Sequence, residues 1–550
     1  MKRTLIATAV LLAWTATAYA GDLVVKVPAE EYEQTKQQLL ELQKRFDAME
    51  KKAVAPQGED VGSSHLRKVN RDIDEIYDTL DKVETRAILD RINLGAEIRI
   101  RADNYQLKEY QPTYYGFNAA NNQFEWYGGA AFSGGMGVYF PAAPPNVVSY
   151  IADERNDSNW SSRFRINMGS EVSNTVQFHA RLALQKNWAD SMGAFNHDNN
   201  RAHVANGDTT LKVDRFYVDW TPKTFIPIGL NFGRLPTSDG PPNEFKEDRK
   251  RQSIYPSLIF DGEPDGIVAT LGLERYTGLK NAGLRYFYAM AVQYDADHTS
   301  MTYLDSVVND MYKDNRVQAV FFETELPKLR DSLLVLSYVP AVDLLMSNPT
   351  GTSMANVGDV TLYGAHLQLV DIFGIGLDLF ASYGMNRNEP SGSTITLADQ
   401  RAGGASLDYG LMTSNVTGGG VSSEVTNGEA WYAGFRYEIP AAFLNRPKIG
   451  FEYNHGSRYW FSYTPGSSEI FNKMATRGEV FDVYYLQPFN KEIFLRVGYT
   501  KIIYHYAGSG MPIGNPVEYD DTTDPFSQMM SPNAQNPEFY NYYLTLDTRF

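Results

Sequence analysis

Residues 91–101 read RINLGAEIRIR, and their side chains alternate between polar and apolar. A period of two residues is typical of a β-strand, because successive side chains point to opposite faces. Strands of a transmembrane β-barrel have this pattern, with the apolar face toward lipid and the polar face toward the lumen. The apolar face carries Ile92, Leu94, Ala96, Ile98 and Ile100, and the polar face carries Arg91, Asn93, Glu97, Arg99 and Arg101.

The same alternation recurs along the chain and predicts sixteen strands. Residues 163–168 and 176–185 belong to the second and third strands, with only Ser173 and Asn174 between the two. The remaining strands are predicted near residues 211–221, 228–235, 264–273, 282–294, 315–326, 332–339, 358–370, 373–386, 428–439, 447–456, 479–487, 492–506 and 538–550.

The connections between these strands alternate between short and long. The short ones are residues 173–174, 222–227, 274–281, 327–331, 371–372, 440–446 and 488–491. Bacterial outer-membrane barrels place short turns in the periplasm and long loops outside, and they have an even number of strands. A soluble β-sandwich also alternates, but it gains nothing from sorting its loops by length. The expected fold class is therefore an all-β transmembrane antiparallel barrel of about sixteen strands, residues 90–550, wide enough for an aqueous lumen.

The first twenty residues predict a signal peptide. Lys2 and Arg3 precede an apolar run, and Ala18 and Ala20 form the small-x-small cleavage pattern, so the mature chain is expected to begin near Gly21. The chain has no cysteine, which excludes a lipoprotein signal, disulfides and covalent haem attachment by this chain. The mean hydropathy of -0.37 is as expected for alternating strands, and 36 Tyr and 29 Phe are typical of a barrel.

Residues 21–89 predict a periplasmic helical segment with two heptad seams. Tyr32 to Met49 form the first seam, a break at Pro56 follows, and Leu66 to Val83 form the second. The mixture of Leu, Ile and Val at the core positions favours a trimer or tetramer over a parallel dimer. An intramolecular helical hairpin, or a helix that plugs the barrel, is the alternative.

The last predicted strand places Tyr542, Leu544, Leu546 and Phe550 on one face. A terminal aromatic residue on a final amphipathic strand resembles the assembly signal of outer-membrane barrels, and Phe550 is the candidate. The whole mature chain resembles porin-like outer-membrane proteins with an N-terminal coiled coil, a functionally uncharacterised Gram-negative family. Residues 233–242, GRLPTSDGPP, are its most distinctive segment. The resemblance implies a channel and names no substrate.

Two sets of charged residues are candidates for the site of function. The first set is the pore-lining group on the polar faces of the early strands, where guanidinium groups would attract phosphate- or carboxylate-bearing solutes. It comprises Arg99, Arg101, Arg163, Arg165, Arg181, Arg215 and Glu97. The alternative is that these arginines pair across the lumen with acids and stiffen the barrel. The acids considered are Glu438, Glu452, Asp482 and Asp547.

The second set lies in the third long loop, residues 236–263. In general porins the third loop folds inward and narrows the pore, so that charges across a narrow gap sort solutes by size and sign. A solvated charge run on an outer loop is the alternative. The constriction candidates are Asp239, Glu244, Asp248, Arg249 and Arg251.

Other features are less specific. The first long loop, residues 103–160, is expected to cap the pore or pack against a neighbour. Asp520, Asp521 and Asp524 could hold calcium, but such acidic loops are usually only solvated. The chain lacks the His-Glu-x-x-His and Gly-x-Ser-x-Gly motifs and a Gly-rich phosphate loop, so we expect no enzyme activity, catalytic residue or cofactor.

The expected function is an outer-membrane, porin-like channel for passive diffusion of small hydrophilic solutes or ions, with a preference for anions. Expected partners are membrane lipid, lipopolysaccharide and further copies of the chain. The formal charge of -16 argues against nucleic acid. Two alternatives remain: an envelope anchor tied to the cell wall through the coiled coil, and a sleeve around a partner multihaem cytochrome.

Overall fold

The computed structural model describes residues 92–118, 123–127, 148–188, 210–292, 315–329, 331–347, 354–398, 406–416, 418–464, 469–516, 518–519 and 537–550. The chain divides into two compact units. One comprises residues 1–94 and 168–178, of which the structure describes residues 92–94, at the start of the first barrel strand, and residues 168–178, which contain the short turn at residues 174–175. The other comprises residues 95–167 and 179–550 and contains the elements described below. The predicted signal peptide, the coiled coil and Asp520, Asp521 and Asp524 lie outside the described residues.

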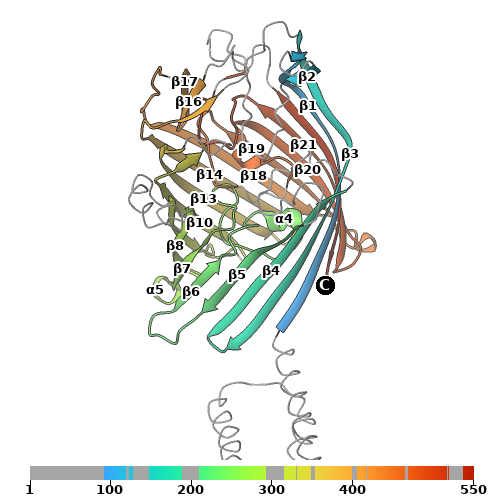
Figure 1. The fold of residues 1–550 in the computed structure, drawn as a ribbon. Helices are drawn as coiled ribbons and strands as arrows, with labels where there is room; N and C mark the ends of the chain where they lie inside the picture. The colour runs from blue at the N-terminus through green and yellow to red at the C-terminus, as the bar shows by residue number, and fades with distance from the viewer. Residues whose placement is uncertain are drawn as a thin grey trace, which may run out of the picture. The chain divides into compact units, whose positions relative to one another are not determined.

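Sixteen antiparallel strands form a closed β-barrel, which confirms the predicted fold class (Figure 1). Sequential strands pair with one another, and β22 pairs with β1, where Arg99 lies opposite Asp547. The strands are β1 (Ile92–Asn118), β3 (Val148–Ser173), β4 (Val176–Asn187), β5 (Thr210–Trp220), β6 (Ile228–Arg234), β7 (Asp265–Gly272), β8 (Gly283–Val292), β9 (Asn315–Thr324), β10 (Leu333–Val342), β13 (Gly358–Ile372), β14 (Leu377–Pro390), β18 (Thr426–Glu438), β19 (Lys448–Gly456), β20 (Gly478–Pro488), β21 (Ile493–Tyr504) and β22 (Glu538–Arg549).

The connections between the barrel strands contain short strands and short helices. The structure contains β2 (Gln123–Tyr127), which extends β1 as a hairpin, the pair β11 (Leu345–Ser347) and β12 (Met354–Asn356), and the sheet β15 (Ile395–Ala398), β16 (Ser406–Gly410) and β17 (Thr413–Val416). Its short helices are α4 (Asn243–Glu247), α5 (Glu274–Thr277), η2 (Ala442–Leu444) and η3 (Lys473–Ala475). No described helix has the length and apolar character needed to cross a membrane.

Two expectations about the strands need correction. The first long loop was expected over residues 103–160, but β1 continues to Asn118 and β3 already begins at Val148. These extensions are rich in Tyr, Gln and Asn and lack a clean alternation, so the sequence pattern did not identify them. The strand expected from residue 373 begins only at Leu377, because residues 373–376 form the turn.

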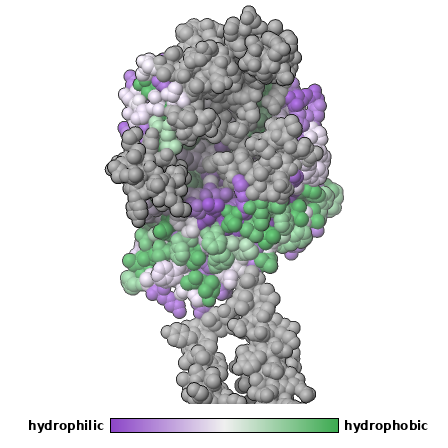
Figure 2. Space-filling model, viewed as in Figure 1, coloured by the Kyte–Doolittle hydropathy of each residue, from purple (hydrophilic) through white to green (hydrophobic). Residues whose placement is uncertain are grey.

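The outer face of the barrel is apolar. Figure 2 shows hydrophobic side chains gathered in a band on the surface, with hydrophilic ones above it. Exposed side chains of this kind belong to many strands, among them Ile98, Trp220, Phe232, Ile267, Tyr286, Leu336, Tyr363, Trp431, Phe435, Ile449, Val483, Val497 and Leu544. An outward apolar band of this composition is typical of barrels that face lipid.

The inner face is not uniformly polar, which differs from the simple polar-inside expectation. From β7 to β18 many inward side chains are apolar and form a core with two loops that enter the barrel, although β13 and β14 also present buried polar side chains such as His366 and Asn386. These wall residues are Val268, Phe287, Ala289, Val317, Ala319, Phe321, Leu333, Val335, Val339, Ala341, Leu362, Phe380, Ala430 and Tyr432. Strands such as β9 and β10 therefore present apolar side chains to both sides, because one side faces lipid and the other faces a buried loop.

Candidate functional site

The third long loop, residues 236–263, folds into the barrel and carries helix α4 (Figure 1). Its local sequence produces this compact path. Asp239 and Asp248 adopt positive φ angles of 60° and 47°, and Asp248 ends α4 in the left-handed conformation. Gly240 is required where the two arms of the loop meet, since a Cβ atom there would lie 1.7 Å from the Tyr255 carbonyl oxygen. The loop thereby presents charged side chains toward several strands at once.

Glu247 at the end of α4 joins the loop to three strands. It forms an ion pair with Arg99 of β1, and its Oε1 lies 3.1 Å from Nη1 of Arg496 on β21. Arg549 of β22 donates to the Glu247 carbonyl oxygen at 2.5 Å. Burial alone would raise the pKa of Glu247, but the surrounding arginines hold it well below its usual value. Glu247 is therefore ionised and anchors α4 to the wall.

Lys246 links the loop to β20 and to a second inward loop, of which the structure describes residues 457–464 and 469–477. Its Nζ lies 2.5 Å from Asp482 and 2.6 Å from Glu469. Lys473 lies 2.9 Å from the same Asp482 and also pairs with Glu452. Burial opposes ionisation of Glu469, yet Lys246 and nearby cations hold the pKa of Glu469 well below its usual value.

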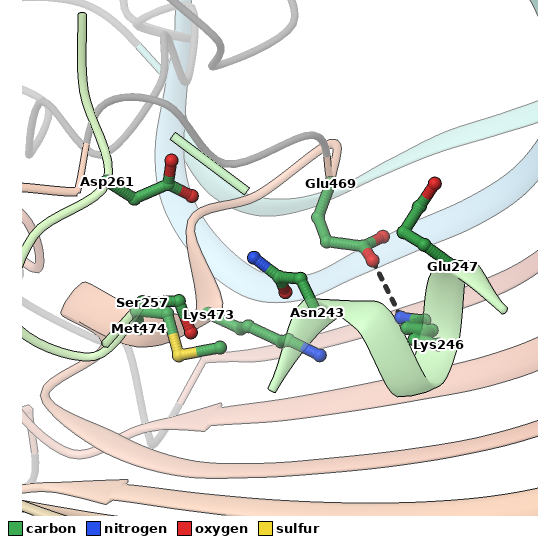
Figure 3. A pocket seen from close by; sticks show the side chains of 8 residues that line it. All are labelled: Asn243, Lys246, Glu247, Ser257, Asp261, Glu469, Lys473 and Met474. Atoms are coloured by element: carbon green, nitrogen blue, oxygen red, sulfur yellow. Dashed lines mark hydrogen bonds and ion pairs between the residues drawn. The ribbon is translucent and has the colours of Figure 1, made fainter. Parts of the chain in front are cut away.

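A cavity lies between the two inward loops, and Figure 3 shows the side chains around it. It measures about 350 Å³, counted with the solvent space at its mouth. Burial alone would lower the pKa of Lys473, but Asp482 and Glu452 raise it well above its usual value. The lining residues are Asn243, Lys246, Glu247, Ser257, Asp261, Glu469, Lys473 and Met474.

Asp239 faces the arginine-rich part of the wall. Its Oδ2 lies 3.3 Å from Arg165 of β3 and 3.3 Å from Arg249 of the same loop. The same oxygen lies 3.7 Å from Arg181 of β4 and 3.8 Å from Arg215 of β5. Four guanidinium groups from three strands and the loop thus meet at one carboxylate oxygen. We call Arg163, Arg165, Arg181, Arg215 and Arg249 the arginine cluster.

The remaining pore-lining candidates lie on the same wall. Arg163 and Arg165 are two residues apart on β3, so both side chains point to the same face, and both are buried. Glu97 of β1 lies 3.3 Å from Arg249 and 4.0 Å from Arg165. Arg101 pairs with Asp103 at 2.7 Å and with Glu469 at 3.1 Å.

The other constriction candidates lie apart from the arginine cluster. Glu244 is buried and accepts a hydrogen bond from Gln368 of β13 at 2.9 Å. Burial raises its pKa, because the hydrogen bond from Gln368 offsets only part of the lost hydration. Asp248 lies 3.2 Å from Arg436 of β18 and also pairs with Lys448 of β19. Arg251 is exposed.

The opposite edge of the loop is apolar and packs on the inner wall. Leu235, Phe245, Tyr255, Leu258, Ile259 and Phe260 belong to the same core as the inward residues of β7 to β18. Phe245 of α4 lies 6.1 Å from Phe380 between ring centroids, and Tyr255 lies 4.7 Å from Phe321 edge to face. Trp460 of the second inward loop is fully buried and donates from Nε1 to the Met474 carbonyl at 2.8 Å. The loop is thus held by charges on one edge and by apolar contacts on the other.

The acids that the sequence suggested as pairing partners occupy different positions. Asp547 accepts from Arg99 at 2.6 Å, whereas Asp482 and Glu452 pair with lysines. Glu438 lies 3.3 Å from the exposed Arg446. Sequence reasoning did not identify Glu469 or Lys473, and it noted Lys246 and Glu247 only as members of the charge run in the third long loop, because nothing in such a run distinguishes a buried member from a solvated one. The Phe550 side chain is exposed and its backbone pairs with Ala96, so its part in assembly stays a prediction.

A closed antiparallel barrel with an apolar outer band and a charged loop folded into its interior defines a porin-like outer-membrane barrel. Within that class, the chain belongs to the family described as a protein of unknown function (DUF3373), whose model matches residues 153–550.

Solved structures with a similar arrangement include porin-sized barrels of low sequence identity. OmpF of Salmonella typhi, in complex with daunomycin, is 9% identical, with a TM-score of 0.41 over 84% of this chain and 97% of its own. OprB of Pseudomonas putida is 9% identical, with a TM-score of 0.42 over 85% of this chain and 96% of its own. No match was found among curated proteins. The barrel assignment rests on the strand pairing of this chain.

Proposed function

We propose that this protein is an outer-membrane channel for passive diffusion of small hydrophilic solutes or ions, narrowed by the loop of residues 236–263. The observation that carries the proposal is the position of α4 inside the barrel. Its charged side chains reach β1 and β21 through Glu247 and β20 through Lys246. A loop fixed in this way sorts solutes by size and charge without any moving part.

A preference for anions is the finer part of this proposal. It is supported by the arginine cluster and by Arg99 and Arg101, which are buried on inward faces of the wall. The low dielectric of the wall strengthens the attraction of these guanidinium groups for anions entering the lumen. Under a potassium chloride gradient, the reversal potential is expected to have the sign of an anion-preferring channel, and cation preference would contradict this part.

The proposal also includes the segments before the barrel. Residues 1–20 would direct export, and residues 21–89 would form a periplasmic coiled coil that supports a trimer. The heptad seams support this arrangement.

Single-channel conductance of the refolded mature protein in a planar bilayer tests the main proposal. The wild-type barrel is expected to give stable steps. A variant in which a short glycine-serine linker replaces residues 243–251 is expected to give larger steps, because α4 and its anchors are removed. If both proteins fold into heat-modifiable barrels and neither conducts, the channel proposal fails.

The apolar core inside the barrel favours a second candidate, an envelope anchor. Two inward loops and the wall from β7 to β18 bury apolar side chains together, as in a filled barrel. In that case the coiled coil would carry the function, through a cell-wall partner. The cytochrome sleeve has less support, because the inward loops lie where a partner inside the barrel would have to sit.

A further inference from the structure

The arginine cluster holds more positive charge than its carboxylate partners neutralise. Four of the five arginines form ion pairs with three carboxylates of the described residues, Glu97, Asp214 and Asp239, so the five arginines carry an excess of 5 − 3 = 2 positive charges over these partners. Asp261, which accepts a hydrogen bond from the Asp239 backbone at 3.2 Å, would still leave an excess of one. Unbalanced charge in a buried site is costly unless a counter-ion accompanies it.

Several members of the cluster have donor atoms without a hydrogen-bond partner among the described residues, and the case is clearest for Arg181 and Arg163. Arg181 is 1% exposed, and its Nε donates hydrogen bonds to Oδ1 and Oδ2 of Asp214 at 2.8 and 2.9 Å. Its Nη1 and Nη2 atoms are buried and have no hydrogen-bond partner among the described residues. Arg163 is 7% exposed, and the described part of the chain provides it with neither an ion pair nor a hydrogen bond.

The geometry around Asp239 indicates what kind of ligand would accept hydrogen bonds from these unpartnered guanidinium groups. Its Oδ2 is the meeting point of four guanidinium groups, but the distances of 3.7 Å to Arg181 and 3.8 Å to Arg215 are too long for hydrogen bonds. One carboxylate oxygen is too small to satisfy four such donors. A tetrahedral oxyanion has four oxygens and up to two charges, and each guanidinium can grip two of its oxygens in a fork.

We propose that the arginine cluster is a binding site for a small, doubly charged tetrahedral oxyanion of the phosphate or sulfate type, bound by Arg163, Arg165 and Arg181 beside Asp239. The site deepens the proposed channel function, because it names the class of solute that the basic wall retains. Asp239 is the resident counter-charge of the site and competes with the solute for the same donors. Arg163, which forms no ion pair with a described residue, supplies the additional charge that a divalent anion requires.

Calorimetric titration of the refolded barrel with inorganic phosphate and with sulfate, in a zwitterionic buffer of low ionic strength, tests the proposal. Both anions are expected to bind saturably, and chloride at the same concentrations is expected not to. Arg163→Gln and Arg181→Gln should each weaken binding about tenfold or more, since each removes charge-assisted hydrogen bonds. Absence of saturable binding to the wild-type protein, or undiminished binding to Arg163→Gln, overturns the proposal.

Arg496→Gln is the matched control. It removes an inward arginine that contacts the same loop, but one that pairs with Glu247 at 3.1 Å outside the cluster. Its affinity for phosphate is expected to stay within about twofold of the wild type. If Arg496→Gln lost as much affinity as Arg163→Gln, the effect would come from the net charge of the barrel, and the proposed site would be wrong. Because Arg163 has no ion pair to lose, Arg163→Gln is expected to fold, and heat-modifiability on a gel checks it.

Asp239→Asn gives an independent result of opposite sign. The amide keeps the shape of the side chain and removes the competing charge, so phosphate should bind more tightly than to the wild type. Unchanged or weaker binding contradicts the role given to Asp239. If the wild-type protein binds phosphate but does not conduct, the anion site stands and the channel proposal fails. If it conducts but does not bind phosphate, the channel proposal stands and the anion site fails.

Discussion

Glu244 and Glu247 lie on the same short helix and have opposite electrostatic environments. Glu244 is buried with one hydrogen bond from Gln368, and its pKa is raised by burial. Glu247 is surrounded by arginines, and its pKa is held well below the usual value. The sequence Asn-Glu-Phe-Lys-Glu gives no sign of this difference, because it arises from the strands that each carboxylate meets.

Glu244→Gln is expected to stabilise the barrel at pH 8 by about 1 kcal/mol, because it removes the cost of ionising a buried carboxyl. The stability associated with Glu244 is fully present below its ordinary pKa of 4.5 and is lost as pH rises through the raised value. The gain should therefore shrink as pH falls toward 4. Chemical unfolding of the refolded protein at both pH values measures it, and a loss of stability at pH 8 would contradict the assignment.

Glu247→Gln is expected to destabilise the protein by about 3 kcal/mol at pH 8, because it leaves buried arginines unpaired. The stability from Glu247 is present above its ordinary pKa of 4.5 and is lost only as pH falls through the lowered value. The loss should therefore persist at pH 4. Chemical unfolding at pH 8 and pH 4 measures this loss of stability. If Glu244→Gln and Glu247→Gln changed the free energy of unfolding in the same way at both pH values, the two carboxylates would not have opposite electrostatic environments.

At the scale of elements, the strands were largely predictable and the inward loops were not. The predicted bounds of β7, β9 and β19 agree with the observed bounds to within about two residues, because successive side chains of each strand still face opposite sides. The inward path of residues 236–263 was expected only from the order of the loops. Its apolar edge was missed, since Leu258, Ile259 and Phe260 form a short run without a period.

A glycine on the inner wall makes room for the second inward loop. Gly384 of β14 points inward, and a Cβ atom there would lie 2.5 Å from the ring of Trp460. Gly384→Val is therefore expected to lower the free energy of unfolding by about 1–3 kcal/mol through overpacking. Urea unfolding followed by tryptophan fluorescence measures the loss.

Ala381→Val is the control for that experiment, on the same strand but on the exposed outward face. Its effect is expected to stay within about 0.5 kcal/mol, because valine suits a strand and meets no loop there. Equal losses in the two variants would show that the loop contact is irrelevant.

At the scale of the whole molecule, the outer band and the inner core together explain why the chain is apolar on both faces of some strands. Leu336 of β10 is 45% exposed on the outside, whereas Val335 beside it is fully buried inside. A sequence pattern that assumes a polar lumen describes β1 and β3 well and describes β10 poorly. The difference follows from where the inward loops lie, which no local pattern reports.

Leu336→Arg is expected to destabilise the barrel in lipid bilayers by about 2–4 kcal/mol, because it places a charge in the lipid-facing band. Phe443→Arg, in the exposed turn between β18 and β19, is the control, with an expected effect of about 0–1 kcal/mol. Unfolding from vesicles measures both effects. Equal stability of the two variants would argue against the band as the membrane-facing surface.

The two edges of the loop at residues 236–263 should also respond differently to temperature. Apolar burial weakens on cooling, whereas buried ion pairs such as Lys246 with Asp482 do not depend on that effect. Near freezing, the edge that holds Tyr255 and Ile259 would loosen first, and the loop would pivot about its ionic edge.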